Sequence, residues 1–100
     1  FIITPLVEKD IAPVYHLYTI RSKNRNQLAR YLMEKGIQTG IYYPVPLHLQ
    51  KALVDLGYKA GDFPTAESMS SDMLCLPIYP ELTKREQNYV LKAISSFFKL

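Results

Sequence analysis

The sequence predicts an α+β fold, a two-layer α/β sandwich in which a small, mainly antiparallel sheet carries helices mostly on one face. Two observations lead to this prediction. Short runs rich in β-branched and aromatic residues alternate with segments of helical periodicity, in the order β, α, β, α, α, β, α. A hydrophobic content of 48% over 100 residues also suffices for one core, so we expect a single compact domain.

The N-terminal part of the chain predicts a linker followed by the first strand. Residues 1–13 contain two prolines and no regular periodicity, which is typical of an extended connection from a preceding domain. Residues 14–21 then form a run of β-branched and aromatic side chains without a helix breaker, which favours a strand. The domain itself is therefore expected over residues 14–100.

A helix and a second strand are predicted next. Asn24 and Gln27 have the spacing of a capping box, and the periodicity that follows predicts a helix over residues 25–35 that ends at Gly36. Residues 37–43 return to β-type composition, and the prolines that follow end this expected strand.

The middle of the chain predicts two helices and a brief strand. A short helix is expected from Leu47 to Gly57, and another begins at Pro64, where a fixed φ suits a first turn. The apolar face expected for this second helix consists of Ala66, Met69 and Met73. Residues 74–76 then predict a strand that stops at the next proline.

The last element is predicted to be an amphipathic helix that packs on the sheet. Thr83 and Glu86 form a capping box at its start. Its expected apolar stripe consists of Val90, Leu91, Ile94, Phe97 and Phe98.

The composition argues against several classes of protein. The net charge of +3 comes from charges scattered along the chain, whereas nucleic-acid binding favours a clustered basic face, so no nucleic-acid partner is expected. The longest uncharged run, residues 37–50, contains a glycine and two prolines, so no membrane association is expected either. Cys75 is the single cysteine and has no neighbours at metal-ligand spacing. We therefore expect a cytoplasmic protein without a metal site.

Several motifs together resemble the DegT/StrS family of sugar aminotransferases. The central ones are YYPVPLHLQ at residues 42–50, LGY at 56–58 and GDFPTAE at 61–67. They are flanked by VYHLYTIR at 14–21, EKGIQTG at 34–40 and LPIYPELT at 76–83. The order and spacing of these motifs cover nearly the whole chain, although many relatives have His where Tyr42 stands and an acidic residue where Asn26 stands.

This resemblance implies a pyridoxal-phosphate-dependent enzyme of the aspartate aminotransferase superfamily. Such enzymes hold the cofactor on a lysine of a large domain, work as homodimers, and move an amino group from glutamate to a keto group of a nucleotide-linked sugar. The present chain would be the C-terminal small domain, which shapes the substrate cleft and the dimer interface. We therefore expect no catalytic, cofactor-binding or metal-binding residue here, and no activity of the fragment alone.

Three residues are candidates for substrate binding. His48 follows a proline turn at a helix start, where a protonatable ring and free N–H groups suit a phosphate, although a local capping role is an alternative. Tyr43 is expected on the opposite strand face from Tyr42 and beside the cleft, with structural packing as the alternative. Arg21 ends an apolar strand and suits the carboxylate of the amino donor, with an ordinary surface charge as the alternative.

Two other function classes remain open at this point. Sandwiches of this size host many unrelated functions, so a stand-alone α/β regulatory or ligand-binding module is the main alternative. A basic nucleic-acid-binding domain fits the net charge but not its scatter.

Overall fold

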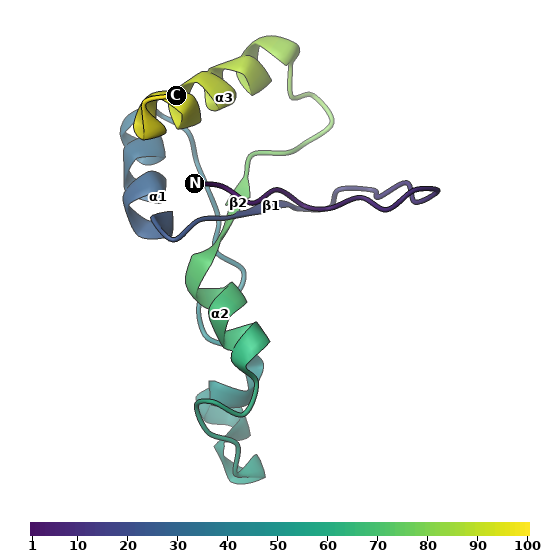
Figure 1. The fold of residues 1–100 in the computed structure, drawn as a ribbon, viewed down its shortest axis with the longest axis vertical. Coiled ribbons are helices and arrows are strands. Elements are labelled where there is room, and N and C mark those ends of the chain that lie inside the picture. Colours follow the sequence, from purple (N-terminus) through teal and green to yellow (C-terminus); the bar gives the residue numbers. More distant parts are fainter.

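The computed structural model describes all residues from Phe1 to Leu100. Its elements are β1 (Tyr18–Arg21), α1 (Arg25–Glu34), η1 (Leu47–Leu49), η2 (Lys51–Leu56), α2 (Pro64–Asp72), β2 (Met73–Leu76) and α3 (Lys84–Phe98), where η denotes a 3₁₀ helix. Figure 1 shows α1 and α3 together at one end of the molecule, with α2 and the 3₁₀ helices extending away from the two strands. None of the helices combines the length and the apolar character that a membrane crossing requires.

The sheet consists of two antiparallel strands, which agrees with the α+β prediction. β1 and β2 pair with Tyr18 opposite Leu76 and Arg21 opposite Met73. The first strand begins at Tyr18 rather than at residue 14, because β2 ends before Pro77 and leaves the earlier residues without a pairing partner. The length of one strand is therefore limited by the length of the other.

The strand predicted over residues 37–43 does not form. Only Gly40 pairs with the sheet, through two backbone hydrogen bonds to Cys75 of 3.0 and 2.8 Å. The ring of Tyr42 then folds back over Gly40, where a Cβ atom would lie only 2.7 Å from the ring carbon Cζ. The chain consequently leaves the sheet after one bridge, and the following prolines cannot donate to a ladder.

The core lies where α1 and α3 cover the sheet. Its fully buried side chains include Ile20 of β1, Leu28 and Leu32 of α1, and Leu74 of β2, while Ile94 of α3 retains 8% of its exposure. This arrangement confirms that these two helices pack on one side of the strands.

The ends of α1 and α3 are only partly as predicted. Thr83 accepts a hydrogen bond from the Glu86 N–H, and the Glu86 carboxylate accepts one from the Thr83 N–H, so the capping box of α3 is confirmed. The capping box predicted at Asn24 is wrong, because its side chain makes no cap hydrogen bond. Gly36 follows α1 with a φ of +74°, a conformation that glycine adopts without strain.

The helix predicted from Leu47 to Gly57 is instead two short 3₁₀ helices, separated by the extended residue Gln50. The apolar side chains of this segment are not covered by another element, and Leu47 and Leu56 are 68% and 62% exposed. Periodicity alone could not show this, because a helical face stabilises a helix mainly when another element covers it.

The inward face of α2 also differs from the prediction. Pro64 opens the helix as expected. However, Ser70 is buried whereas Ala66 and Met69 are exposed. α2 extends away from the α1–α3 layer (Figure 1), so its apolar residues do not meet the core.

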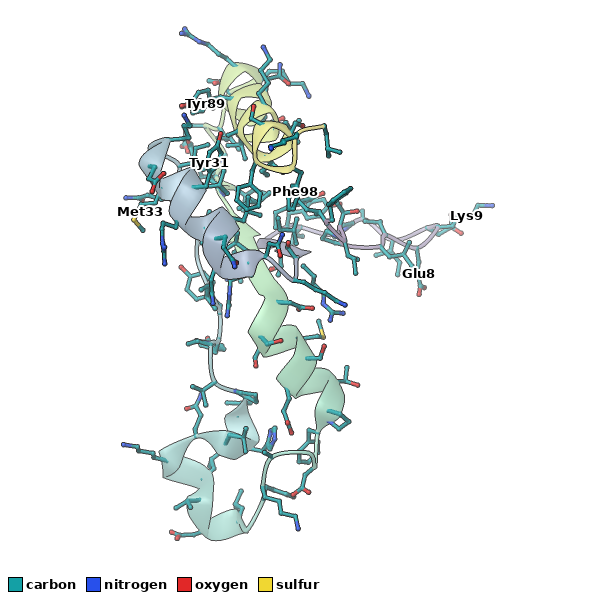
Figure 2. The ribbon with its side chains drawn as sticks, turned by 60° about the vertical axis from the view of Figure 1, so that its left-hand side comes forward. Glu8, Lys9, Tyr31, Met33, Tyr89 and Phe98 are labelled. Carbon is teal, nitrogen blue, oxygen red and sulfur yellow. The ribbon has the colours of Figure 1, made fainter.

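The molecule is less compact than its length predicts. Its radius of gyration is 15.7 Å, whereas a compact 100-residue domain has a radius of about 13 Å. Residues 1–17 contribute by forming a long arm with Glu8 and Lys9 at its tip (Figure 2). The root of this arm is tied to the fold, since Ile3 pairs with Arg21 and the Phe1 ring contacts the Phe98 ring.

Candidate functional site

His48 lies in η1 and is held by a residue of another element. Its Nε2 atom is 2.9 Å from Oε1 of Glu67 in α2, and its ring centroid is 4.8 Å from that of Phe63. The His48 side chain retains only 8% of its exposure. The structure therefore joins the YYPVPLHLQ segment to the start of α2 through this histidine.

The carboxylate of Glu67 connects two other segments of the chain, η1 and the loop that precedes α2. In addition to His48, it accepts hydrogen bonds from the N–H of Gly61 at 2.9 and 3.1 Å and from the N–H of Phe63 at 3.3 Å. These contacts lower the pKa of Glu67, and the Gly61 hydrogen bond is the largest cause. Desolvation opposes this change, whereas His48 and Phe63 add to it. The carboxylate is thus suited to its ionised form.

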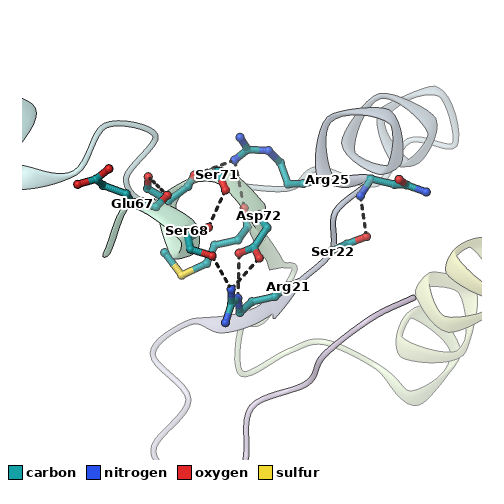
Figure 3. Close-up of polar contacts among 10 residues, drawn as sticks. Arg21, Ser22, Arg25, Glu67, Ser68, Ser71 and Asp72 are labelled. Atoms are coloured by element: carbon teal, nitrogen blue, oxygen red, sulfur yellow. Dashed lines mark hydrogen bonds and ion pairs between the residues drawn. The ribbon is translucent and has the colours of Figure 1, made fainter. Parts of the chain in front are cut away.

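Arg21 meets a carboxylate, but one that belongs to its own chain. Figure 3 shows its guanidinium against Asp72 at the end of α2, with Nε–Oδ1 and Nη2–Oδ2 distances of 2.9 and 2.8 Å. Nη2 also donates to the Ser68 hydroxyl at 3.2 Å. The two-point geometry expected for the amino donor is therefore occupied by Asp72, whose hydrogen bond raises the pKa of Arg21.

Tyr42 and Tyr43 are both exposed, at 51% and 67%. The expectation that strand alternation sends them to opposite faces depended on a strand that does not form here. Their rings instead meet edge to face, with a centroid distance of 6.3 Å. Tyr43 remains available for contact with another molecule.

The three candidates do not converge on one pocket of this chain. His48 is joined to Glu67 and Arg21 to Asp72, so the two lie toward opposite ends of α2. Glu67 and Asp72 are five positions apart, which is about 7.5 Å along the helix axis. A groove of about 910 Å³ lies beside the arm, where Arg21 and Met73 line it but His48 and Tyr43 do not.

Glu67 is a site residue that the sequence motifs alone did not single out. It is the acidic residue in the first turn of a helix that begins at Pro64. An acidic side chain at this position is favoured by the helix dipole and can reach the N–H groups that precede the helix, which is the signal that could have identified it. Asp62, in the turn before this helix, accepts a hydrogen bond from the Lys59 N–H at 2.9 Å.

The sequence profile of the DegT/DnrJ/EryC1/StrS aminotransferase family matches residues 1–95. The chain belongs to this family. Its homologues in the DegT/DnrJ/EryC1/StrS family include sugar aminotransferases, and members of the family depend on pyridoxal phosphate. The resemblance seen in the motifs is therefore confirmed.

Three similar DegT/DnrJ/EryC1/StrS proteins illustrate the relationship. A pleiotropic regulatory protein of Geobacillus stearothermophilus is 43% identical over 98% of this chain, and the match covers 26% of that protein. The dTDP-3-amino-3,6-dideoxy-alpha-D-galactopyranose transaminase of Aneurinibacillus thermoaerophilus is 38% identical over 97% of the chain, again covering 26% of that protein. The crystal structure of S. venezuelae DesV in complex with a ketimine intermediate matches 96% of the chain with a TM-score of 0.92 and 36% identity, covering 26% of DesV. The chain thus spans about a quarter of the length of these relatives.

The residues of this DegT/DnrJ/EryC1/StrS chain do not fit the cofactor on which the family depends. A lysine that forms a Schiff base at neutral pH needs a desolvated or electropositive surrounding that lowers its pKa. All eight lysines here are exposed: Lys9, Lys23, Lys35, Lys51, Lys59, Lys84, Lys92 and Lys99. No step of cofactor chemistry is therefore assigned to this chain.

Proposed function

We propose that the chain is the C-terminal small domain of a longer nucleotide-sugar aminotransferase, in which it shapes the substrate cleft. The whole enzyme would transfer an amino group from glutamate to a keto group of a nucleotide-linked sugar. The observation that carries this proposal is the match of nearly the whole backbone to the structures of DesV and of a DegT DnrJ EryC1 StrS aminotransferase from Brucella abortus. In this proposal, residues 14–100 are the small domain and residues 1–13 connect it to the cofactor-binding domain.

The proposal assigns pyridoxal phosphate and its lysine to the part of the enzyme that lies outside this chain. This assignment is supported by the exposure of every lysine in the chain. The cofactor supplies the site that accepts and releases the amino group. The small domain would contribute binding and orientation of the substrate, and it would be inactive alone.

Tyr43 and His48 are the proposed contacts to the nucleotide sugar. Tyr43 is exposed and precedes the proline turn, and His48 follows the same turn with its Nε2 atom anchored on Glu67. Arg21 is proposed as a contact to the donor carboxylate, which would have to replace Asp72 on the guanidinium. Of the three, Arg21 has the strongest competing structural role.

The enzyme is also proposed to be a cytoplasmic homodimer. Leu6 and Val14 of the arm are 90% and 93% exposed and line the same groove, and exposed apolar surface of this kind marks regions that contact other protein. The cytoplasm is proposed because the only cysteine, Cys75, is unpaired. The mass of the full-length protein in solution, measured by light scattering, tests the oligomeric state.

The function is tested on the full-length protein with glutamate and a keto nucleotide sugar as separate single-turnover substrates. His48→Ala should slow the nucleotide-sugar half-reaction and leave the glutamate half-reaction nearly unchanged, as followed through the cofactor absorbance. His16→Ala is the matched control, because His16 is exposed and makes no side-chain hydrogen bond within the chain.

Two results would contradict these assignments. Equal losses in both half-reactions would indicate that His48 supports folding or domain closure rather than substrate contact. Absence of amino transfer to any nucleotide sugar by the unaltered full-length protein would refute the enzymatic proposal and favour a regulatory or ligand-binding module.

A further inference from the structure

The hydrogen bonds around Glu67 determine which nitrogen of His48 carries the proton. Oε1 of Glu67 accepts the N–H groups of Gly61 and Phe63 and also lies 2.9 Å from Nε2 of His48. Backbone N–H groups only donate, so Oε1 is an acceptor in this arrangement. Nε2 must therefore donate to it, and the neutral His48 ring has its single proton on Nε2.

The other ring nitrogen, Nδ1, is consequently a hydrogen-bond acceptor in the neutral ring. It makes no hydrogen bond within the chain, since the His48 side chain bonds only to Glu67. The only fully covered side-chain nitrogen or oxygen without a partner is Nε of Arg25, so Nδ1 of His48 is not fully covered. Nδ1 is therefore the ring nitrogen left for contact with another molecule.

Two features hold the ring in this orientation. Phe63 lies against it with an interplanar angle of 58°, and the lowered pKa of Glu67 keeps the carboxylate ionised at neutral pH. Glu67 itself is anchored by the N–H of Gly61, so it cannot follow the ring if the ring turns.

We propose that Glu67 is the positioning residue of His48 and that, in the neutral ring, it makes Nδ1 an acceptor for a hydroxyl group of the sugar. This inference rests on the proposed contact between His48 and the nucleotide sugar. It changes the chemistry of that contact, because a neutral ring held in this way offers a lone pair, whereas a phosphate requires a donor.

Nitrogen-15 NMR of histidine-labelled chain tests the proton position directly, at a pH where the rings are neutral. His48 should show a pyrrole-type shift at Nε2 and a pyridine-type shift at Nδ1. His16, the only other histidine and an exposed one, serves as the internal reference with averaged shifts. A proton on Nδ1 of His48, or averaging equal to that of His16, would overturn the inference.

Substitutions of Glu67 separate positioning from general stability. Glu67→Gln keeps an amide oxygen in place of Oε1, so the His48 shifts should be retained. Glu67→Ala should move them toward the averaged values of His16. Glu34→Ala is the matched control, because Glu34 is exposed and makes no side-chain hydrogen bond. If Glu67→Ala unfolds the loop, the unaltered chain and Glu67→Gln still test the proton position. A His48 ring without its proton on Nε2 in either of these two proteins would contradict the inference.

The full-length enzyme supplies the functional test. Glu67→Ala should raise the KM for the nucleotide sugar about fivefold, the ratio expected for the loss of one hydrogen bond. The loss should disappear in a His48→Ala background, because Glu67 acts through His48. An additional loss in that background would refute the positioning role. If His48→Ala alone has no effect while the NMR result holds, the proposed substrate contact fails and the proton assignment stands.

Discussion

Arg21 of β1 and Asp72 of α2 form a two-point ion pair that ties the sheet to the end of α2, with both N···O distances below 3.0 Å (Figure 3). The residues are 51 positions apart in the chain. Since His48 and Glu67 join η1 to the beginning of the same helix, α2 is held near both ends by side-chain contacts rather than by a core.

Loss of the ion pair between Arg21 and Asp72 should make α2 less stable. Asp72→Asn removes the charge and one acceptor while preserving the size of the side chain, so we expect a lower thermal midpoint and faster amide exchange in α2. Arg30→Gln is the matched control, because Arg30 is exposed and makes no ion pair or side-chain hydrogen bond. Unchanged exchange in α2 would show that the ion pair contributes nothing there, as is common for exposed pairs.

Alanine substitutions at two adjacent residues of α1 should have very different effects on stability, because only one of the two side chains lies in the core. Leu32 is fully buried, so Leu32→Ala should reduce the free energy of unfolding by about 3 kcal/mol through lost burial and the cavity left behind. Met33 is 71% exposed, so Met33→Ala should cost less than about 0.5 kcal/mol. Denaturant titrations measure both, and similar costs would mean that the buried face of α1 is wrongly assigned.

The cap of α3 should be measurable on its own. Thr83→Ala removes the acceptor of the Glu86 N–H, and the free energy of unfolding should fall by about 1 kcal/mol. Ser96→Ala, an exposed substitution on the same helix, should cause no loss. Equal midpoints for Thr83→Ala and the unaltered chain would indicate that the cap does not limit stability.

Acid should destabilise the chain through two carboxylates. Hydrogen bonds from Gly61 and from Thr83, respectively, are the largest causes that lower the pKa values of Glu67 and Glu86 below their ordinary value of 4.5. The unfolded chain therefore binds more protons in this range, and the stabilisation is fully present above pH 4.5 and is lost as pH falls through the folded-state values. In denaturant titrations across this range, Glu67→Gln and Glu86→Gln should each show a weaker loss than the unaltered chain. If a variant loses as much stability at acid pH as the unaltered chain, the carboxylate that it lacks does not contribute to the acid sensitivity.

The exposed lysines predict how the chain responds to added pyridoxal phosphate. Reduction with borohydride followed by peptide mapping should show low, dispersed labelling over the eight lysines, because none has a surrounding that favours reaction at neutral pH. A stoichiometric adduct on one lysine would show that this chain holds a cofactor site.

Local patterns predicted several elements well because their signals lie within a few residues. The capping box of Thr83 and Glu86, the proline that opens α2 and the glycine that follows α1 depend on backbone hydrogen bonds and dihedral angles of neighbouring residues. Elements that need a partner elsewhere were less predictable. Residues 37–43 have strand composition but form one bridge, and the apolar face of α2 has no core opposite it.

The candidate site shows the same distinction. The motif around His48 and its family resemblance could be found in the sequence, but the partner of His48 could not, since Glu67 is 19 residues away. The carboxylate expected opposite Arg21 was that of a bound amino donor, whereas the structure places Asp72 there.

The order of residues was thus enough to predict the family, the α+β class, the end of α1 and the starts of α2 and α3, since short-range backbone chemistry and ordered motifs carry that information. The lengths of the strands, the direction of α2 and the proton position on His48 were decided only in the folded chain. Each depends on a pairing between residues far apart in the sequence, and such a pairing forms only when the whole chain brings its members within a few ångströms of one another.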